Sequence, residues 1–149
     1  MKEAIVIDAT CLIILERINQ LKILPQLFQP VIISTGVAKE FGGSFEWLTV
    51  ETPSDETLVR SLRLRLHLGE AETIALAYEN GTRVLLDDLR ARTIATKLGL
   101  RIIGTLGMLV LAKRESFIPN LTNVLEQLED NGFYMSNDLR NEVIRLVGE

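Results

Sequence analysis

The chain has 149 residues, of which 47% are hydrophobic and 24% charged, so a single domain with a packed core is expected and general disorder is excluded. Its net charge of −4 argues against indiscriminate binding to nucleic acid. No apolar run approaches the roughly 20 residues that span a bilayer, and the first residues do not look like a signal peptide. We therefore expect a cytoplasmic protein without a membrane segment.

Five apolar runs are predicted to be β-strands, and most lack the polar alternation of a half-exposed strand. In chain order they are Ala4–Ile7, Val31–Ile33, Trp47–Val50, Val84–Leu86 and Arg101–Ile103. Such runs are typical of parallel strands buried on both faces. Between and after them, helical periodicity begins near Leu12, Leu21, Leu58, Glu70, Leu89 and Leu106. This alternation predicts an α/β fold with a mostly parallel sheet.

Two details of the helices are predicted from local signals. Ser54 or Asp55 is expected to cap the helix that contains Leu58. In the helix that begins at Glu70, the spacing of Ile74, Ala77 and Tyr78 predicts one shared face.

The last 30 residues, 120–149, predict two amphipathic helices separated by Gly132. The second helix should carry Leu139 on its apolar face and be capped near Ser136 or Asn137. We expect the pair to pack on the α/β core. The alternative is a partner surface, because the apolar faces are broad.

Four acidic residues occur where a metal site in such a fold would need them. Asp8 and Asp88 follow the first and fourth predicted strands, Glu70 opens a helix, and Glu40 ends the short segment that contains Gly36. The carboxyl ends of parallel strands meet at one edge of a sheet, where ligands bind. Gathered carboxylates repel one another unless a cation or a proton compensates, and Mg²⁺ or Mn²⁺ suits oxygen ligands. The set therefore indicates phosphodiester chemistry assisted by a metal ion.

Each acid also has a simpler interpretation when taken alone. Asp8 and Asp88 could cap helices, Glu70 could complement a helix dipole, and Glu40 could be an ordinary surface acid. Glu72, close to Glu70, is a spare acid, and periodicity favours Glu70 for the pocket. The metal hypothesis thus depends on the set rather than on any one residue.

Other side chains complete the expected site. Thr10 and Thr105 could hold a metal-bound water or a phosphate, with helix capping as the alternative and the preferred interpretation for Thr105. Arg90, Arg92 and Arg101 could guide the backbone of a nucleic acid. They belong to a basic cluster that also includes Arg83 and Lys97, and Arg60, Arg63 and Arg65 form another. A solvated surface is the simpler interpretation of either cluster.

Competing catalytic sets are missing from the sequence. Cys11 is the only cysteine and His67 the only histidine, which excludes an internal disulfide and a Cys/His zinc cluster within one chain. There is no P-loop, no Gly-x-Gly-x-x-Gly and no Gly-x-Ser-x-Gly. We expect Cys11 to pack as a small apolar residue, and His67 to lie at the surface or to support a functional residue.

Together these residues resemble the PIN domain, in particular a prokaryotic branch related to the VapC-type toxins. The resemblance covers about residues 3–115 as the core, and residues 116–149 resemble that branch's C-terminal helical extension, within one domain over 1–149. The matching segments are Val6–Thr10, the segment ending at Glu40, Gly69–Ala77, Leu86–Asp88 and Gly104–Thr105. The resemblance implies a three-layer α/β/α sandwich around a central, mostly parallel sheet.

The resemblance also implies an acidic pocket that binds Mg²⁺ or Mn²⁺, and endoribonuclease activity on single-stranded RNA. Carried over by position, Asp8, Glu70 and Asp88 would bind the metal, Glu40 would orient the attacking water, and Thr10 would accompany Asp8. A toxin role would imply a small protein antitoxin and a homodimer.

One departure from the family pattern supports an alternative function. Many members carry a further acid shortly after the position of Asp88, where this chain has Leu89–Arg92. The alternative is a catalytically weak or inactive module that binds nucleic acid or protein. A receiver domain or a haloacid-dehalogenase-like enzyme is disfavoured, because Asp8-Ala9-Thr10 lacks the second acid that both would need near the first strand.

Overall fold

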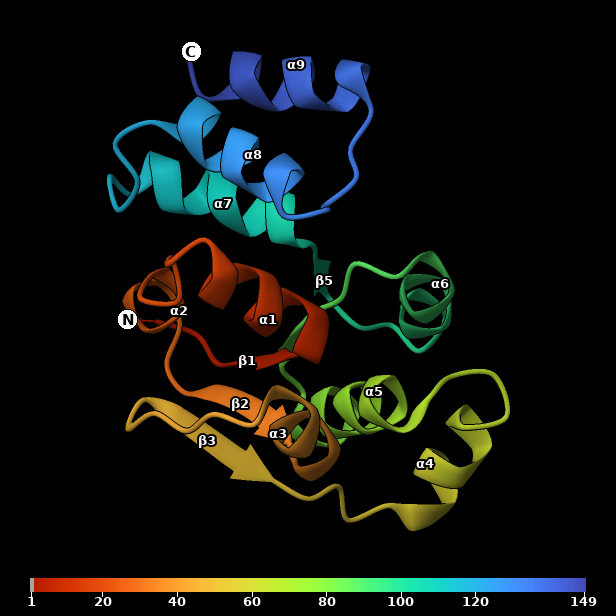
Figure 1. Cartoon of the computed structure of the whole chain (residues 1–149). Helices are drawn as coiled ribbons and strands as arrows, with labels where there is room; N and C mark the ends of the chain where they lie inside the picture. The colour runs from red at the N-terminus through yellow and green to blue at the C-terminus, as the bar shows by residue number, and fades with distance from the viewer. Residues whose placement is uncertain (1) are drawn as a thin grey trace.

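The computed structural model describes residues 2–149, and five strands within this range form one sheet in which every neighbouring pair is parallel (Figure 1). Its order is β3-β2-β1-β4-β5. The strands are β1 (Ile5–Ile7), β2 (Val31–Ser34), β3 (Leu48–Glu51), β4 (Arg83–Leu85) and β5 (Ile102–Ile103). The five predicted strands and the α/β class are confirmed, and the sheet is parallel throughout.

The strand order reverses beside β1. The chain runs outward from β1 through β2 to β3, then crosses to the other side of β1 to form β4 and β5. In register, Ile5 pairs with Val31 of β2 and with Arg83 of β4. A reversal of this kind opens a crevice at the carboxyl ends of the two central strands. Asp8 follows β1 directly at this point.

Nine helices connect and follow the strands within residues 2–149. They are α1 (Ala9–Arg17), α2 (Ile23–Leu27), α3 (Thr35–Phe41), α4 (Glu56–Leu62), α5 (Leu68–Asn80), α6 (Leu89–Lys97), α7 (Thr105–Arg114), α8 (Leu121–Asp130) and α9 (Asn137–Leu146).

Local side chains determine where several of these helices begin. Asp8, Asp55, Asp88 and Ser136 each accept a hydrogen bond from a backbone amide in the first turn of α1, α4, α6 and α9. Such caps satisfy amides that have no partner within the helix. The caps predicted for α4 and α9 are confirmed, with Asp55 rather than Ser54 at α4. The simpler interpretation of Asp8 and Asp88 as helix caps also holds.

Side chains from the two faces of the sheet enter two separate cores. Ile5, Ile7 and Leu85 pack in one cluster with α1, α7, α8 and α9. Val6 and Val84 pack in the other cluster with α4, α5 and α6. Neighbouring strand residues point to opposite faces, so the fold has three layers, α/β/α.

The predicted face of α5 is partly wrong. Ile74 and Ala77 are buried, but Tyr78 is 52% exposed. Helix α5 spans 13 residues, about 20 Å, whereas β1 and β4 beneath it have three residues each. The last turn of α5 therefore extends past the strands that would have covered Tyr78.

The two C-terminal helices pack against α7 and against each other, at the β5 edge of the molecule (Figure 1). This confirms the predicted helical pair on the core. Leu139, predicted on the apolar face of the last helix, remains 45% exposed. None of the helices within residues 2–149 combines the length and the hydropathy needed to cross a bilayer.

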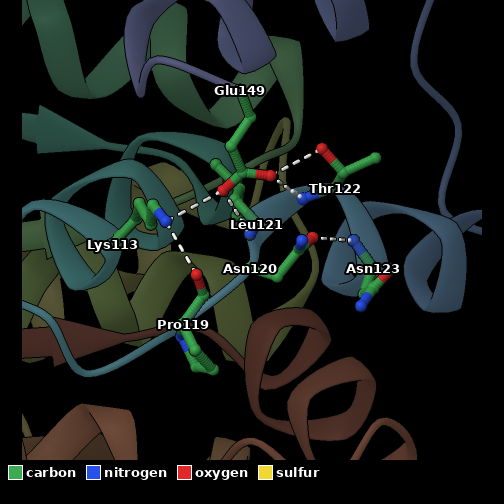
Figure 2. Close-up of polar contacts among 7 residues, drawn as sticks. All are labelled: Lys113, Pro119, Asn120, Leu121, Thr122, Asn123 and Glu149. Carbon is green, nitrogen blue, oxygen red and sulfur yellow. Dashed lines mark hydrogen bonds and ion pairs between the residues drawn. The ribbon is translucent and has the colours of Figure 1, made fainter.

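The side chain of Glu149 connects the end of the chain to the start of α8 (Figure 2). It accepts hydrogen bonds from the amides of Leu121 and Thr122, at 2.7 and 2.9 Å, and from the Thr122 hydroxyl at 2.6 Å. The Lys113 ammonium lies 3.1 Å from the same carboxylate and donates to Pro119 O at 2.7 Å. This contact was not predicted, because its partners are separated by 27 or more residues.

Candidate functional site

The four predicted acids lie on four different elements around the crevice beside β1. Asp8 is the cap of α1, immediately after β1, and Asp88 is the cap of α6, after β4. Glu70 is in the first turn of α5 and Glu40 near the end of α3. Asp8 and Glu70 are buried, at 6% and 7% exposure, whereas Glu40 and Asp88 are open to solvent.

Two of these carboxylates lie over Gly69, in the first turn of α5. A Cβ atom at Gly69 would lie 3.4 Å from Glu40 Oε2 and 3.8 Å from Asp8 Oδ1. Both oxygens therefore lie over the same point of the α5 backbone. Glycine leaves this space free, since any other residue would place a side chain against both carboxylates.

The pKa of Asp8 reflects its burial and its acidic neighbours. Burial raises it from 3.8 to about 6, against the opposing effect of the hydrogen bond from the Ala9 amide. The charges of Glu70 and Glu40 raise it further, and His67 opposes them. The folded protein thus resists placing a full negative charge at this position.

Glu70 is subject to the same forces. Burial raises its pKa, His67 lowers it, and the charges of Asp88 and Glu40 raise it again. The His67 Nε2 atom lies 3.2 Å from Glu70 Oε1 while the His67 side chain stays 64% exposed. His67 is therefore a surface residue that contacts Glu70, as the sequence suggested.

Glu72 does not join this cluster. Its Oε1 atom accepts a hydrogen bond from the Gly36 amide at 2.8 Å, at the start of α3. A Cβ atom at Gly36 would lie 2.5 Å from the same oxygen. Of the two acids of α5, Glu70 rather than Glu72 therefore lies with the other carboxylates, and Glu70 is the residue that periodicity favoured.

The donor set suits a hard divalent cation. Mg²⁺ and Mn²⁺ prefer carboxylate oxygens, and Mg²⁺ keeps several of its water ligands in proteins. Among residues 2–149, no three His, Cys, Asp or Glu side chains are close enough to chelate a metal on their own. A cation at Asp8 and Glu70 would therefore rely on water for part of its coordination. Its charge would offset the burial and the repulsion that raise both pKa values.

The two threonines occupy different surroundings. Thr10 is exposed in the first turn of α1, one residue after Ala9. Thr105 is fully buried, and its hydroxyl donates to Asp87 Oδ2 at 2.5 Å. The expectation that Thr105 holds a ligand, or caps its helix, is not met, because Asp87 engages both its hydroxyl and its amide.

Cys11 is buried as expected. Burial raises the pKa of its thiol well above the usual range, in spite of a hydrogen bond with Thr105. A thiol held neutral in this way is a poor nucleophile or metal ligand.

Only one of the three predicted nucleic-acid-binding arginines reaches the acids. Arg90 lines a groove of about 950 Å³ that also contains Glu70 and Asp88. Arg92 turns toward Gly104, where a Cβ atom would lie 2.9 Å from its Nη1. Arg101 precedes β5 and so lies at the amino-terminal ends of the strands, where it pairs with Glu3 at 3.1 Å.

The same groove contains two cations that sequence reasoning did not assign to the site. Arg65, in the link between α4 and α5, and Lys97, in the last turn of α6, both line it. Their basic clusters were visible in the sequence, but the shared groove depends on how α4, α5 and α6 pack.

Comparison with known proteins identifies the family. A family model described as a PIN domain matches residues 4–149. No curated protein sequence matches the chain. Among solved structures, a PilT N-terminus domain protein from the hyperthermophilic archaeon Sulfolobus solfataricus P2 is similar, with 18% identity over 70% of this chain and 89% of that chain and a TM-score of 0.46. Because the family model spans nearly the whole chain, the protein belongs to the PIN-domain family, whose members are generally nucleases.

Proposed function

We propose that this protein is a divalent-metal-dependent nuclease that hydrolyses phosphodiester bonds in single-stranded RNA. The observation that carries the proposal is the meeting of Asp8, Glu40, Glu70 and Asp88 at the carboxyl edge of the sheet, with the pKa values of Asp8 and Glu70 raised. Such an anionic, partly buried site favours a cation, and the PIN-domain family supports the reaction class.

In this proposal the chain's own side chains have distinct roles. Asp8, Glu70 and Asp88 would hold Mg²⁺ or Mn²⁺, directly or through water, and the exposed Thr10 hydroxyl would position a ligand water. Glu40, over Gly69, would orient the attacking water toward phosphorus. A bound cation of this kind lowers the pKa of its water and offsets charge on the phosphoryl oxygens. Arg90 would contact the strand next to the acids.

The test is cleavage of a mixed-sequence single-stranded RNA in Mg²⁺ or Mn²⁺, with and without EDTA. Asp8→Asn and Asp88→Asn should each lose about 100-fold or more in rate, because each removes a carboxylate charge that would hold the cation. Asn keeps the capping ability of both positions, so the fold should survive.

Asp55→Asn is the matched control. Asp55 is also a capping aspartate, at the start of α4, and the substitution removes the same charge. It should cleave like the wild type. Cleavage that persists in both Asp8→Asn and Asp88→Asn would contradict the assignment.

A second candidate function is a binding module with weak or no catalysis. Two observations favour it: no three metal-ligating side chains among residues 2–149 form a ready site, and Arg90 lines the groove near the position of a further family acid. Calorimetry with Mn²⁺ distinguishes the two functions. Cation binding without any cleavage would favour the binding module, and metal-dependent cleavage would exclude it.

A toxin role with an antitoxin partner, and homodimer formation through the helices after residue 105, are further proposals. The half-exposed Leu139 and Leu146 of α9 support an apolar contact surface. Light scattering of the purified protein tests the dimer. Co-purification with the product of an adjacent gene tests the antitoxin, and growth arrest on expression tests the toxin role.

A further inference from the structure

The groove beside the acids has a cationic wall. Arg65, Arg90 and Lys97 line it, together with Glu70 and Asp88. Within residues 2–149, none of these three cations forms an ion pair with a carboxylate. On a chain of net charge −4, unpaired cations that share one groove indicate an anionic ligand.

The wall leads away from the acids along α6. Asp88 caps the start of this helix, Arg90 is in its first turn, and Lys97 ends it about 10 Å beyond Arg90. The Arg90 Nη1 atom lies 3.5 Å from Arg65 O, which brings the link between α4 and α5 against the same side. A smaller cavity of about 250 Å³ shares Arg65 and Lys97 and continues the groove between α4 and α6.

The groove also has apolar lining residues, beside His67 and Thr93. Leu66, Leu89 and Ile94 contribute to the groove, and Leu89 is 80% exposed. Apolar side chains contact bases and riboses without reading a hydrogen-bond pattern, while cations follow the phosphates. The lining therefore fits a strand of any sequence.

We propose that this groove binds the sugar–phosphate backbone of a single strand on one side of the scissile phosphate, with Arg65, Arg90 and Lys97 as phosphate-binding residues. A stacked strand advances about 3.4 Å per nucleotide, so α6 would accompany about three nucleotides. The inference rests on the proposed function for the identity of the acidic end, where the scissile phosphate would lie.

Binding is measured without catalysis, by fluorescence anisotropy of a labelled 12-nucleotide 2′-O-methyl RNA in EDTA. The double variant Arg65→Gln/Lys97→Gln should bind about tenfold more weakly than wild type at low salt. Its affinity should also depend less on salt, with the logarithmic slope smaller by about 1.4, because two phosphate contacts are lost.

Arg114→Gln/Arg145→Gln is the matched control. It removes the same charge from exposed positions on α7 and α9, which pack in the other core. It should bind like wild type. Equal losses of affinity in the two double variants would mean that net charge alone governs binding, and would overturn the proposal. Equal affinity of the wild type for a duplex of the same length would also overturn it.

Two outcomes separate this inference from the proposed nuclease. If the strand binds through Arg65 and Lys97 but no RNA is cleaved in Mn²⁺, the groove assignment stands and the nuclease assignment fails. If RNA is cleaved but Arg65→Gln/Lys97→Gln binds and cleaves like wild type, the groove assignment fails alone. A cleavable strand can also carry neutral methylphosphonate linkages on either side of the cut. They should raise KM when they lie on the side that binds the groove, and not on the other side. An equal rise in KM for both sides would overturn the one-sided groove.

Discussion

Asp87 and Thr105 are joined by two hydrogen bonds that bridge the segments following β4 and β5. The Thr105 amide donates to Asp87 Oδ1 at 2.8 Å and its hydroxyl to Oδ2 at 2.5 Å. Gly104 makes room for this contact, since a Cβ atom there would lie 3.1 Å from Asp87 Oδ1. The pair therefore holds the segment that carries Asp88 against the start of α7.

Removal of this contact should destabilise the fold. We expect Asp87→Ala to lower the free energy of unfolding by about 2 kcal/mol, because buried Thr105 loses its acceptor. For a chain of this size that is a fall in Tm of about 4–8 °C. Asp130→Ala, an exposed acid at the end of α8, is the control and should change Tm little. A Tm for Asp87→Ala equal to that of the control would contradict this account.

Gly69→Ala should separate stability from cation binding. Its Cβ atom would make ordinary contacts of 3.4 and 3.8 Å with Glu40 and Asp8, and alanine favours helix by up to about 1 kcal/mol. Thermal stability should therefore hold or rise. Mn²⁺ affinity, measured by calorimetry, should fall about tenfold because the methyl group occupies space beside Asp8, a proposed ligand of the cation.

Gly107→Ala tests whether any helical glycine has this effect. Gly107 is in α7, where a Cβ atom would contact only Ile103. Its Mn²⁺ affinity should match wild type. An unchanged affinity in Gly69→Ala would show that the cation does not lie beside Asp8 on the side that faces Gly69.

The stability of the metal-free protein should fall as pH rises from 4 to 6.5. Asp8 titrates at 3.8 when unperturbed and at about 6 in the folded protein, so between these values the folded state holds the extra proton. Stability is then lost as pH rises through this window, by about 3 kcal/mol at most. Asp8→Asn cannot ionise and should be more stable than wild type at pH 7.5.

Mn²⁺ provides the second half of this test. At pH 7.5 it should raise the Tm of wild type and leave that of Asp8→Asn nearly unchanged, because a bound cation stabilises the folded state by mass action. Scanning calorimetry at several pH values measures both effects. A wild-type Tm that rises steadily from pH 4 to 7.5, parallel to that of the variant, would argue against a raised pKa of Asp8 in the folded protein.

Glu149 should stabilise the C-terminal helices above pH 4.5. Burial acts to raise its pKa, but hydrogen bonds from Thr122 and Leu121 and the ammonium of Lys113 lower it from 4.5 to about 2. The stabilisation is therefore complete above 4.5 and disappears as pH falls through 2. Glu149→Gln should cost about 1–2 kcal/mol at pH 7, since the start of α8 loses a charged cap.

The matched control is Glu142→Gln. Glu142 also pairs with a cation, Arg145, but on the open surface of α9, where ion pairs contribute little. Urea unfolding at pH 7 and pH 2.5 compares the two variants. If the free energy of unfolding of Glu149→Gln differs from that of wild type by the same amount at both pH values, the ionised carboxylate is not the stabilising group.

Much of this protein was determined by short stretches of sequence. The buried parallel strands were predictable because their apolar runs lack alternation, and the caps Asp8, Asp88 and Ser136 because each bonds an amide of the first turn of its own helix. The position of Asp8 and Asp88 at one edge follows once the strands are parallel. These features depend on neighbours within a few residues, or on a general property of parallel sheets.

Only the tertiary structure decided how side chains from distant segments meet. Thr105 was expected to cap its helix or to hold a ligand, yet it bonds to Asp87 from across two strand ends. Arg101 was expected at the site. It precedes β5, however, and therefore lies at the amino-terminal ends of the parallel strands, whereas Asp8 lies at their carboxyl ends. Arg65 and Lys97 share a groove only because α4 and α6 pack with α5 on the same face of the sheet. These contacts arise from the packing of whole elements, which local sequence patterns do not encode.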